Sequence, residues 1–281
     1  MVKNQLKTAI LLSILTALLL WVGSLFGRGG FIFALIFVVI MNFVSYWWSH
    51  KIVLWMYRAR EAKEKDYPKL YMIVREVSKL ANLPMPKVYI IPTKSANAFA
   101  TGRGPKSAAV AATEGILDIL NEEELKGVIS HEFAHIKNRD ILISTIAGTI
   151  AGVIGYIAAM ARWSAIFGGR DDDRGNNLIS LLILGILTPL IATIIQLAIS
   201  RSREYLADEA GAKFVKNGNA LADALEKIEK NTDINPLRFG NTATAHLFIA
   251  NPFRGQAFLA LFMTHPPTKK RAERLRSMNF N

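Results

Sequence analysis

The segment His131-Glu132-Phe133-Ala134-His135 has the form H-E-x-x-H, with two histidines four residues apart. On an α-helix, residues at i and i+4 lie on one face, so both imidazole rings can reach the same metal ion. The glutamate beside the first histidine can then activate a water molecule, because a bound zinc ion lowers the pKa of water to about 7. The pattern predicts a metal-dependent hydrolase with His131 and His135 as ligands and Glu132 as general base.

The residues before this motif predict the helix that it requires. Asn121 can cap a helix and Glu124 follows three residues later, as in a capping box, so we expect a helix over residues 122–138. Histidine pairs at this spacing also occur by chance on helix surfaces. The chain contains only five histidines, which makes a chance match rarer, and the metal site is the interpretation that we retain.

A catalytic zinc site usually has three protein ligands and an open position for water. The chain has no cysteine, so each ligand must be a histidine or a carboxylate. The longer motif with a third histidine is absent, because Asn138 and Ile141 occupy its next two positions. We expect Glu204 as the third ligand, with Asp208 one turn later accepting the other N–H of a ligand histidine. A helix with ordinary surface charges is the alternative interpretation of this E-x-x-x-D pattern.

Four long apolar runs separate the polar segments that carry these residues. The chain is 51% hydrophobic, yet 20% of its residues are charged, so part of it must face water. The runs cover residues 9–26, 31–48, 141–161 and 178–199, and none contains a charged residue. Because a membrane-spanning helix needs roughly 20 apolar residues, we expect four transmembrane helices. A cleaved signal peptide is the alternative for the first run, but no small-residue cleavage site follows it.

The distribution of basic residues predicts the orientation of these helices. All but four of the 34 Lys and Arg residues fall on one side of four such spans; the exceptions are Arg28, Arg162, Arg170 and Arg174. By the positive-inside rule this side is the cytoplasm, and it would contain both termini. The net charge of +12 is therefore better explained by membrane flanks than by nucleic-acid binding. His135 lies six residues before the third run and Glu204 five after the fourth, so a hairpin would hold both at similar height.

The polar segments predict a small α+β domain. We expect helices over residues 66–81, 202–216 and 219–230, and a basic helical tail over 266–281. Short strands over residues 87–92, 97–101 and 107–113 would form a small antiparallel sheet. The predicted fold is a mainly α membrane protein. It has two transmembrane helices in residues 1–50, a transmembrane hairpin in 141–199, and a zincin-like catalytic domain assembled from residues 51–140 and 200–281.

Together these features resemble the HtpX family of membrane-bound zinc metallopeptidases. The resemblance covers nearly the whole chain and shows no departure at the motif positions. It rests on the two N-terminal spans, Asn97-Ala98-Phe99, the H-E-x-x-H segment, the residues from Ser200 to Asp208, and His265-Pro266-Pro267-Thr268-Lys269-Lys270-Arg271.

The resemblance implies one zinc ion per chain, held by His131, His135 and Glu204, with Glu132 as general base and Asp208 supporting a ligand histidine. It also implies that His265 and Arg271 are catalytic residues that stabilise the tetrahedral intermediate through their charge. An ordinary turn residue before two prolines is the alternative for His265.

The segment Asn97-Ala98-Phe99 is similar to the edge strand that pairs with the substrate backbone in this family. An ordinary hairpin strand is the alternative. The family role implied for the chain is a zinc endopeptidase in protein quality control and the stress response. It would hydrolyse damaged or misfolded membrane proteins near the cytoplasmic face of a bacterial cell (inner) membrane. The expected partners are protein substrates and the lipid bilayer, without nucleic acid, and the oligomeric state is left open.

Three other functions fit parts of the sequence. A CAAX prenyl protease shares the zinc motifs but is longer and has more spans than the four runs found here. A membrane scaffold with a structural metal would have no need of the Glu132 carboxylate. A channel or transporter usually places polar groups in the middle of its spans. Only Gln196 and a few Ser, Thr and Asn residues do so here.

Overall fold

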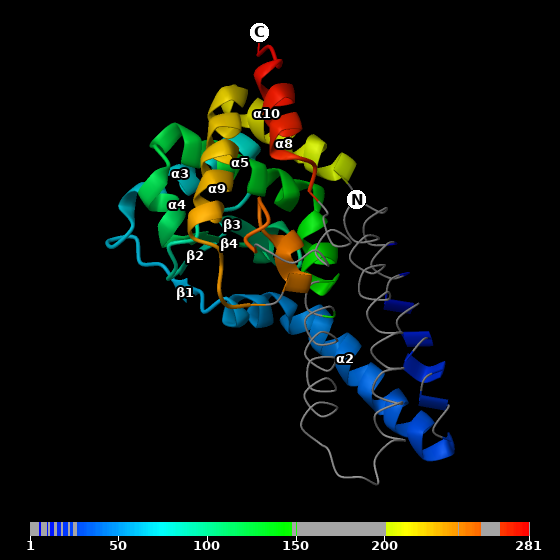
Figure 1. The fold of residues 1–281 in the computed structure, drawn as a ribbon. Coiled ribbons are helices and arrows are strands. Elements are labelled where there is room, and N and C mark those ends of the chain that lie inside the picture. Colours follow the sequence, from blue (N-terminus) through cyan, green and yellow to red (C-terminus); the bar gives the residue numbers. More distant parts are fainter. Residues whose placement is uncertain are drawn as a thin grey trace.

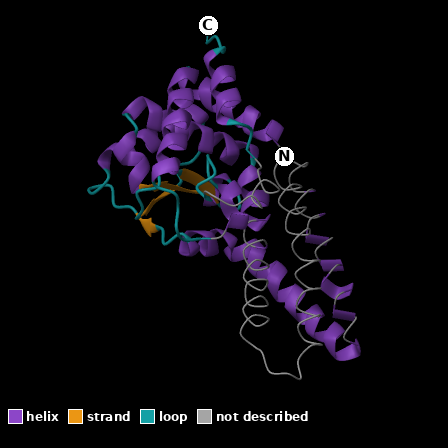
Figure 2. Cartoon of the chain, viewed as in Figure 1, coloured by secondary structure: helices purple, strands orange, loops and turns teal. Residues whose placement is uncertain are grey.

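The computed structural model describes residues 27–147, 201–240, 242–253 and 265–280, together with residue 150 and isolated positions between 6 and 24. This part of the chain is mostly helical and contains one small mixed sheet. Figure 1 shows most of the helices gathered on one side of the sheet, with a single long helix leading away from this domain. The strands lie inside the domain, between helices and loops (Figure 2).

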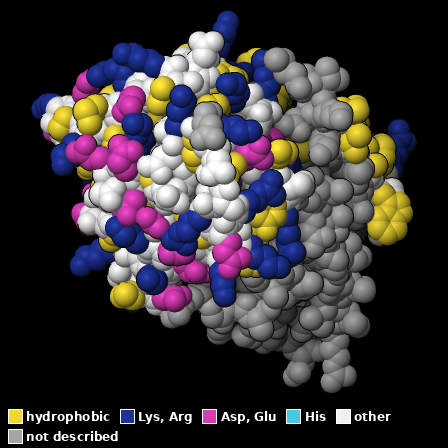
Figure 3. Space-filling model, turned by 90° about the horizontal axis from the view of Figure 1, so that it is seen from above, with side chains coloured by type: hydrophobic (Ala, Val, Ile, Leu, Met, Phe, Trp, Pro, Cys, Tyr) yellow, Lys and Arg dark blue, Asp and Glu magenta, His cyan; other side chains and the backbone are white. Residues whose placement is uncertain are grey.

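The long helix is α2 (Gly27–Met56), which contains the whole apolar run 31–48 and extends beyond it at both ends. It is long and apolar enough to cross a membrane. Many of its exposed side chains are large and apolar, among them Phe33, Ile36 and Val39, and such a surface is stable in lipid rather than in water. The domain beyond it carries interspersed basic and acidic side chains on the face shown in Figure 3.

The other three predicted spans are not tested by this part of the chain. The first run, residues 9–26, is described only at isolated positions, all of them helical. The third run begins as helix over residues 141–147, and the fourth lies outside the described residues. Four transmembrane helices therefore stay a prediction.

The sheet has the strand order β1-β2-β4-β3, formed by β1 (Arg60–Glu61), β2 (Lys87–Ile91), β3 (Ala98–Thr101) and β4 (Ala109–Thr113). Strands β3 and β4 form the predicted antiparallel hairpin, but β2 and β4 are parallel, so the prediction of an antiparallel sheet is wrong. Residues 92–97 carry the chain past β2, and β4 then occupies the middle of the sheet. Sequential strands usually pair, and this crossover breaks that tendency. As a result, β3 lies at the edge.

Both faces of strands β3 and β4 are buried, which explains the nearly continuous apolar composition of β4. One face contacts helices α3 (Pro68–Ala81), α5 (Glu122–Asn138) and α9 (Gly218–Ile234). The opposite face packs against the end of α2 and against Leu237, Leu247 and Phe248. There Tyr57, Phe99 and Phe248 form an aromatic cluster with ring centroids 4.8 to 5.9 Å apart.

Helix α5 has the bounds that the capping box predicts. The Asn121 side chain accepts a hydrogen bond from the Glu124 N–H at 2.9 Å, and the Glu124 carboxylate accepts one from the Asn121 N–H at 2.9 Å. The helix ends where Arg139 adopts a left-handed conformation with φ of 58°. Its central turns are buried on almost every side, including His131 and Glu132. The motif helix is therefore a core helix.

Helix α8 (Arg201–Val215) packs directly on α5, although more than sixty residues separate them in the sequence. Glu204, Asp208 and Gly211 lie along the face of α8 that meets α5. A Cβ atom added at Gly211 would lie 2.8 Å from the backbone nitrogen of His131. Only glycine therefore permits this approach of the two backbones. The remaining elements are η1 (Pro105–Ser107), α4 (Glu114–Ile119), η2 (Thr242–Leu247) and α10 (Thr268–Arg276).

We predict that Gly211→Ala destabilises the protein by about 1–3 kcal/mol, because the added methyl group separates α8 from α5. Alanine normally stabilises a helix interior by about 1 kcal/mol relative to glycine, so the sign of the change is diagnostic. Chemical unfolding in detergent measures the free energy. Gly104→Ala is the control, because a Cβ at Gly104 meets nothing within 4 Å. A stabilised Gly211→Ala protein would contradict the close packing described here.

Candidate metal centre

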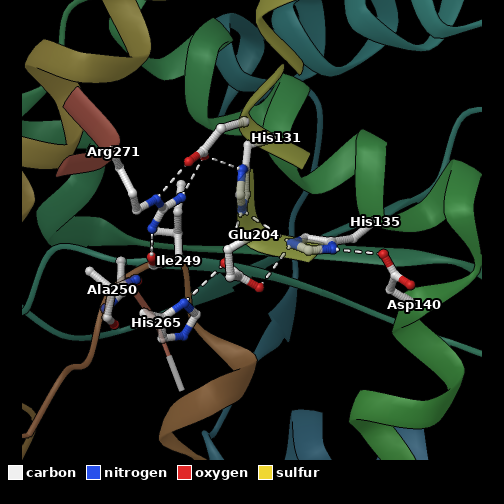
Figure 4. Close-up of polar contacts among 10 residues, drawn as sticks. His131, His135, Asp140, Glu204, Ile249, Ala250, His265 and Arg271 are labelled. Carbon is white, nitrogen blue, oxygen red and sulfur yellow. Dashed lines mark hydrogen bonds and ion pairs between the residues drawn. The ribbon is translucent and has the colours of Figure 1, made fainter. Parts of the chain in front are cut away.

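Three side chains from two helices converge in the buried space between α5 and α8 (Figure 4). The Nε2 atoms of His131 and His135 lie 3.2 Å apart. The carboxylate of Glu204 lies 3.8 Å from the first Nε2 and 3.7 Å from the second. Ligands of a tetrahedral zinc ion, each about 2.1 Å from the metal, are separated by about 3.4 Å. The spacing of these donor atoms therefore fits one small cation.

The other nitrogen of each ring faces a carboxylate. His131 Nδ1 lies 2.9 Å from Asp208 Oδ1, and His135 Nδ1 lies 3.3 Å from Asp140 Oδ2. A carboxylate beside Nδ1 holds the proton on that nitrogen and leaves a lone pair on Nε2. When both rings are neutral, two lone pairs and the Glu204 oxygens point at the same space. A cation bound there would replace the proton that His135, whose pKa is raised to about 9, holds in the metal-free site.

Each of these carboxylates also has an arginine side chain close to it: Arg271 near Asp208 and Arg203 near Asp140. Arg271 donates from Nε and from a terminal nitrogen to the two Asp208 oxygens, at 2.8 and 2.7 Å, and from its other terminal nitrogen to the Ile249 carbonyl at 2.8 Å. Its guanidinium group holds the pKa of Asp208 at about 2, although burial alone would raise it. Arg203 lies 3.7 Å from Asp140. The orientation of each ring is therefore supported by a buried charge pair.

Glu132 is buried beside the three donor atoms and lines the same small cavity. Burial raises the pKa of its carboxyl to about 8, and the negative charge of Glu204 acts in the same direction. His135 and a hydrogen bond from the Ala100 N–H oppose that shift. A carboxyl group with a pKa near neutrality can both accept and return a proton, as a general base requires.

The surroundings of the two histidines shift their pKa values in opposite directions. Burial lowers the pKa of His131 to about 4, and the carboxylate of Asp208 only partly offsets this effect. Burial lowers the pKa of His135 too, but the hydrogen bond to Asp140 and the charge of Glu204 outweigh it and raise the pKa to about 9. Burial would raise the pKa of Glu204, yet His265 and His135 hold it well below its usual value. Glu204 is therefore ionised and ready to bind a cation.

His265 lies next to Glu204, with its Nδ1 3.0 Å from Glu204 Oε2. Its Nε2 is buried and has no hydrogen-bond partner within the described part of the chain. The ring lines a cavity of about 30 Å³ together with the donor atoms, Glu132 and Arg203. Arg271 does not line this cavity, because its guanidinium group is committed to Asp208 and Ile249. The two predicted catalytic residues of the C-terminal segment thus have different surroundings.

The predicted substrate-binding strand has buried side chains. The Asn97 amide donates to the Ala250 carbonyl at 2.7 Å, and Phe99 belongs to the aromatic cluster beneath the sheet. The Ala98 carbonyl accepts a hydrogen bond from the Ile249 N–H at 3.0 Å. Of strand β3, only Ala100 lines the metal cavity. A role of residues 97–99 in substrate binding stays a prediction.

Sequence reasoning missed Asp140 and Arg203. Asp140 follows His135 by five residues, beyond the regular end of α5, and the left-handed Arg139 turns the chain so that its carboxylate reaches the ring. A carboxylate shortly after an H-E-x-x-H helix was the available signal. Arg203 directly precedes Glu204, and only the packing of α8 shows that its side chain enters the cavity.

The fold and the site together define a membrane-associated metallopeptidase: a helix pair with a glutamate beside two histidine donors, in a domain attached to a long apolar helix. Residues 64–279 match the family described as Peptidase family M48, and the chain belongs to this family. The resemblance to the HtpX family is confirmed by relatives described as "Protease HtpX homolog". The one from Syntrophobacter fumaroxidans is 51% identical and covers 98% of this chain and 99% of its own length. The one from Pyrococcus abyssi is 54% identical, with 97% and 95% covered.

A solved structure has a fold similar to that of this chain. The crystal structure of S. mikatae Ste24p aligns with a TM-score of 0.52 and covers 98% of this chain and 67% of that chain. At 15% sequence identity, this similarity concerns the fold alone.

We predict that Asp140→Asn weakens zinc binding about 10–100-fold, because the His135 ring loses the carboxylate that orients it. Competition with a chelator of known affinity measures the dissociation constant. Glu209→Gln is the matched control, since Glu209 lies on α8, away from the donor atoms, and pairs with Lys213 at 2.6 Å. Equal zinc affinities for Asp140→Asn and the wild type would show that this carboxylate does not support the site.

We further predict that Arg271→Met destabilises the protein by about 3–5 kcal/mol, because it leaves the Asp208 carboxylate buried without its partner. The free energy of unfolding in detergent, measured without metal, tests this. Arg276→Met serves as the control on the same helix, because the ion pairs of Arg276 with Asp223 and Glu226 are exposed. Similar stability of the two variants would contradict the role given to the buried pair.

Proposed function

We propose that the chain is a zinc-dependent endopeptidase, with one zinc ion held by His131, His135 and Glu204. The observation that carries this proposal is the convergence of the three donor groups, two of them backed by carboxylates, next to the buried Glu132. Two histidines and a glutamate are the ligands of several zinc peptidases. Membership of a metallopeptidase family supports the same assignment.

A zinc ion in this position would supply a Lewis acid that polarises the scissile carbonyl and acidifies water. Glu132 accepts the proton of the attacking water and passes it to the leaving amine. Its position beside both histidines suits the two transfers. A bound cation would lower the pKa that burial raises, so that the carboxylate can accept a proton at neutral pH. The burial of Glu132 keeps bulk water away from the proton that it holds.

His265 is the residue that we propose for stabilising the tetrahedral intermediate. Glu204 orients the ring through Nδ1, and Nε2 remains available at the cavity. When Nε2 carries a proton, it can donate to the oxygen on which negative charge develops. For Arg271 we propose a positioning role, because it contacts Asp208 rather than the cavity.

We propose that the substrate backbone approaches along the outer edge of β3. Ala100 brings this edge to the cavity, and an extended peptide could add to it as a further strand. Near Asn97 and Ala98 the edge is covered by Ile249 and Ala250, so a bound peptide would either begin beyond these residues or displace that segment.

We also propose a location and a cellular role. Helix α2 and the three other apolar runs would anchor the chain as a multi-pass protein of the cell membrane. Residues 51–140 and 200–281 would then form one cytoplasmic catalytic domain, in line with the distribution of basic residues. Substrates that are damaged or misfolded membrane proteins, cleaved near the cytoplasmic surface, are consistent with this arrangement and with a role in quality control.

We predict that Glu132→Gln lowers cleavage of an unfolded substrate such as casein by at least about a hundredfold, because the amide cannot accept a proton. Both proteins would be purified in detergent with chelator present and then given one equivalent of zinc. The release of peptides is the measurement.

Zinc content is determined for both proteins, because the glutamine variant must retain the metal for the comparison to hold. Glu123→Gln on the same helix is the control, since Glu123 is exposed. Cleavage by Glu132→Gln at the wild-type rate would refute the assigned base. If the zinc-loaded wild type also left casein intact, this result would contradict the proposed endopeptidase activity on unfolded substrates.

A further inference from the structure

A hollow of about 400 Å³ lies where the apolar helix α2 meets the turn between β3 and β4. Aromatic and basic side chains line it, and none of the described lining residues is a carboxylate. They are Phe43, Trp47, Trp48, His50, Lys51 and Arg103. The first five come from α2, and Arg103 comes from the turn that follows strand β3. The hollow is separate from the metal centre, with which it shares no lining residue.

Some nitrogen atoms of the side chains that line this hollow have no hydrogen-bond partner among the described residues. The Arg103 guanidinium lies over the Trp47 ring at 4.5 Å from its centroid, which fixes the group in place. Arg103 Nε and His50 Nδ1 are buried and have no hydrogen-bond partner among the residues that the structure describes. Lys51 adds a second positive charge at the exposed rim. Buried polar atoms without a partner are rare, and here they favour a ligand with acceptor oxygens and negative charge.

The position of the hollow indicates where such a ligand comes from. The apolar run of α2 ends at Trp48, and Lys51 follows three residues later. Tryptophan and basic residues at the end of a membrane-spanning helix lie at the level of the lipid headgroups. Phe43, Trp47 and Trp48 are about half exposed and would contact acyl chains just below that level.

We propose that this hollow binds the headgroup of an anionic phospholipid. The phosphate oxygens would accept hydrogen bonds from the terminal nitrogens of the Arg103 guanidinium group and pair with the charge of Lys51. The acyl chains would lie against the aromatic side chains of α2. This proposal rests on the placement of α2 in a membrane and does not depend on peptidase activity.

A bound lipid would connect the membrane surface to the catalytic domain. Arg103 is separated by two residues from Ala100, whose strand reaches the metal cavity. A headgroup held by Arg103 would therefore set the height of the β3 edge above the bilayer. Substrates that emerge from the same headgroup layer would meet this edge directly.

The test uses the full-length protein in a neutral detergent, titrated with phosphatidylglycerol. Retained lipid is counted by native mass spectrometry, and the unfolding temperature is recorded in parallel. Each basic residue near an anionic lipid contributes about fivefold in affinity, so Lys51→Gln with Arg103→Gln should weaken binding about thirtyfold. Lys106→Gln, an exposed basic residue on the same turn, is the matched control and should bind like the wild type.

The double variant must unfold at the wild-type temperature without lipid, which shows that its fold is intact, and Arg103→Lys is the milder substitute if it does not. Zinc-dependent casein cleavage in neutral detergent should be unchanged in these variants, so failure of this site is distinguishable from failure of the peptidase. Equal phosphatidylglycerol binding by the double variant and the wild type would overturn the proposal. So would binding of phosphatidylcholine with the same affinity, or saturation of the site by inorganic phosphate alone.

Discussion

The convergence of three potential metal ligands in the buried centre of the domain is the constraint on which the rest of the structure depends. The two Nε2 atoms of His131 and His135 lie 3.2 Å apart, with the ionised Glu204 beside them. Without a bound cation, a proton on His135 supplies the positive charge, and the donor groups need rigid support in either state. The support comes from Asp208 and Asp140, each placed against the second nitrogen of one ring. Because a buried carboxylate is costly without a partner, an arginine near each one completes the arrangement.

The close packing of α5 and α8 makes this arrangement possible. Gly211 removes the side chain that would otherwise separate the helices, and Glu204 and Asp208 then reach the same two histidines from one face of α8. Arg271 links α10 to α8 and, through the Ile249 carbonyl, to the segment that covers the edge of β3. The candidate metal centre is thus built from both polar segments of the chain, residues 51–140 and 200–281. A change in any one of them alters the orientation of the donors.

The catalytic domain and the membrane helix also meet through specific contacts. The end of α2 packs beneath the sheet, where Tyr57 joins Phe99 and Phe248. On the side facing the proposed headgroup layer, Arg103 stacks on Trp47. The β3–β4 hairpin is therefore held at both ends by α2. These contacts fix the position of the β3 edge relative to α2.

Local signals in the sequence determined the elements that depend only on neighbours along the chain. The spacing of His131 and His135, the capping box at Asn121 and the apolar run inside α2 are of this kind, because helix geometry and caps are fixed within a few residues. Only the tertiary structure decided the order of the strands, the contact of Asp140 with His135, the commitment of Arg271 to Asp208 and the covering of Ala98 by Ile249. These contacts join residues whose approach depends on the packing of the whole domain, and no local pattern encodes that approach.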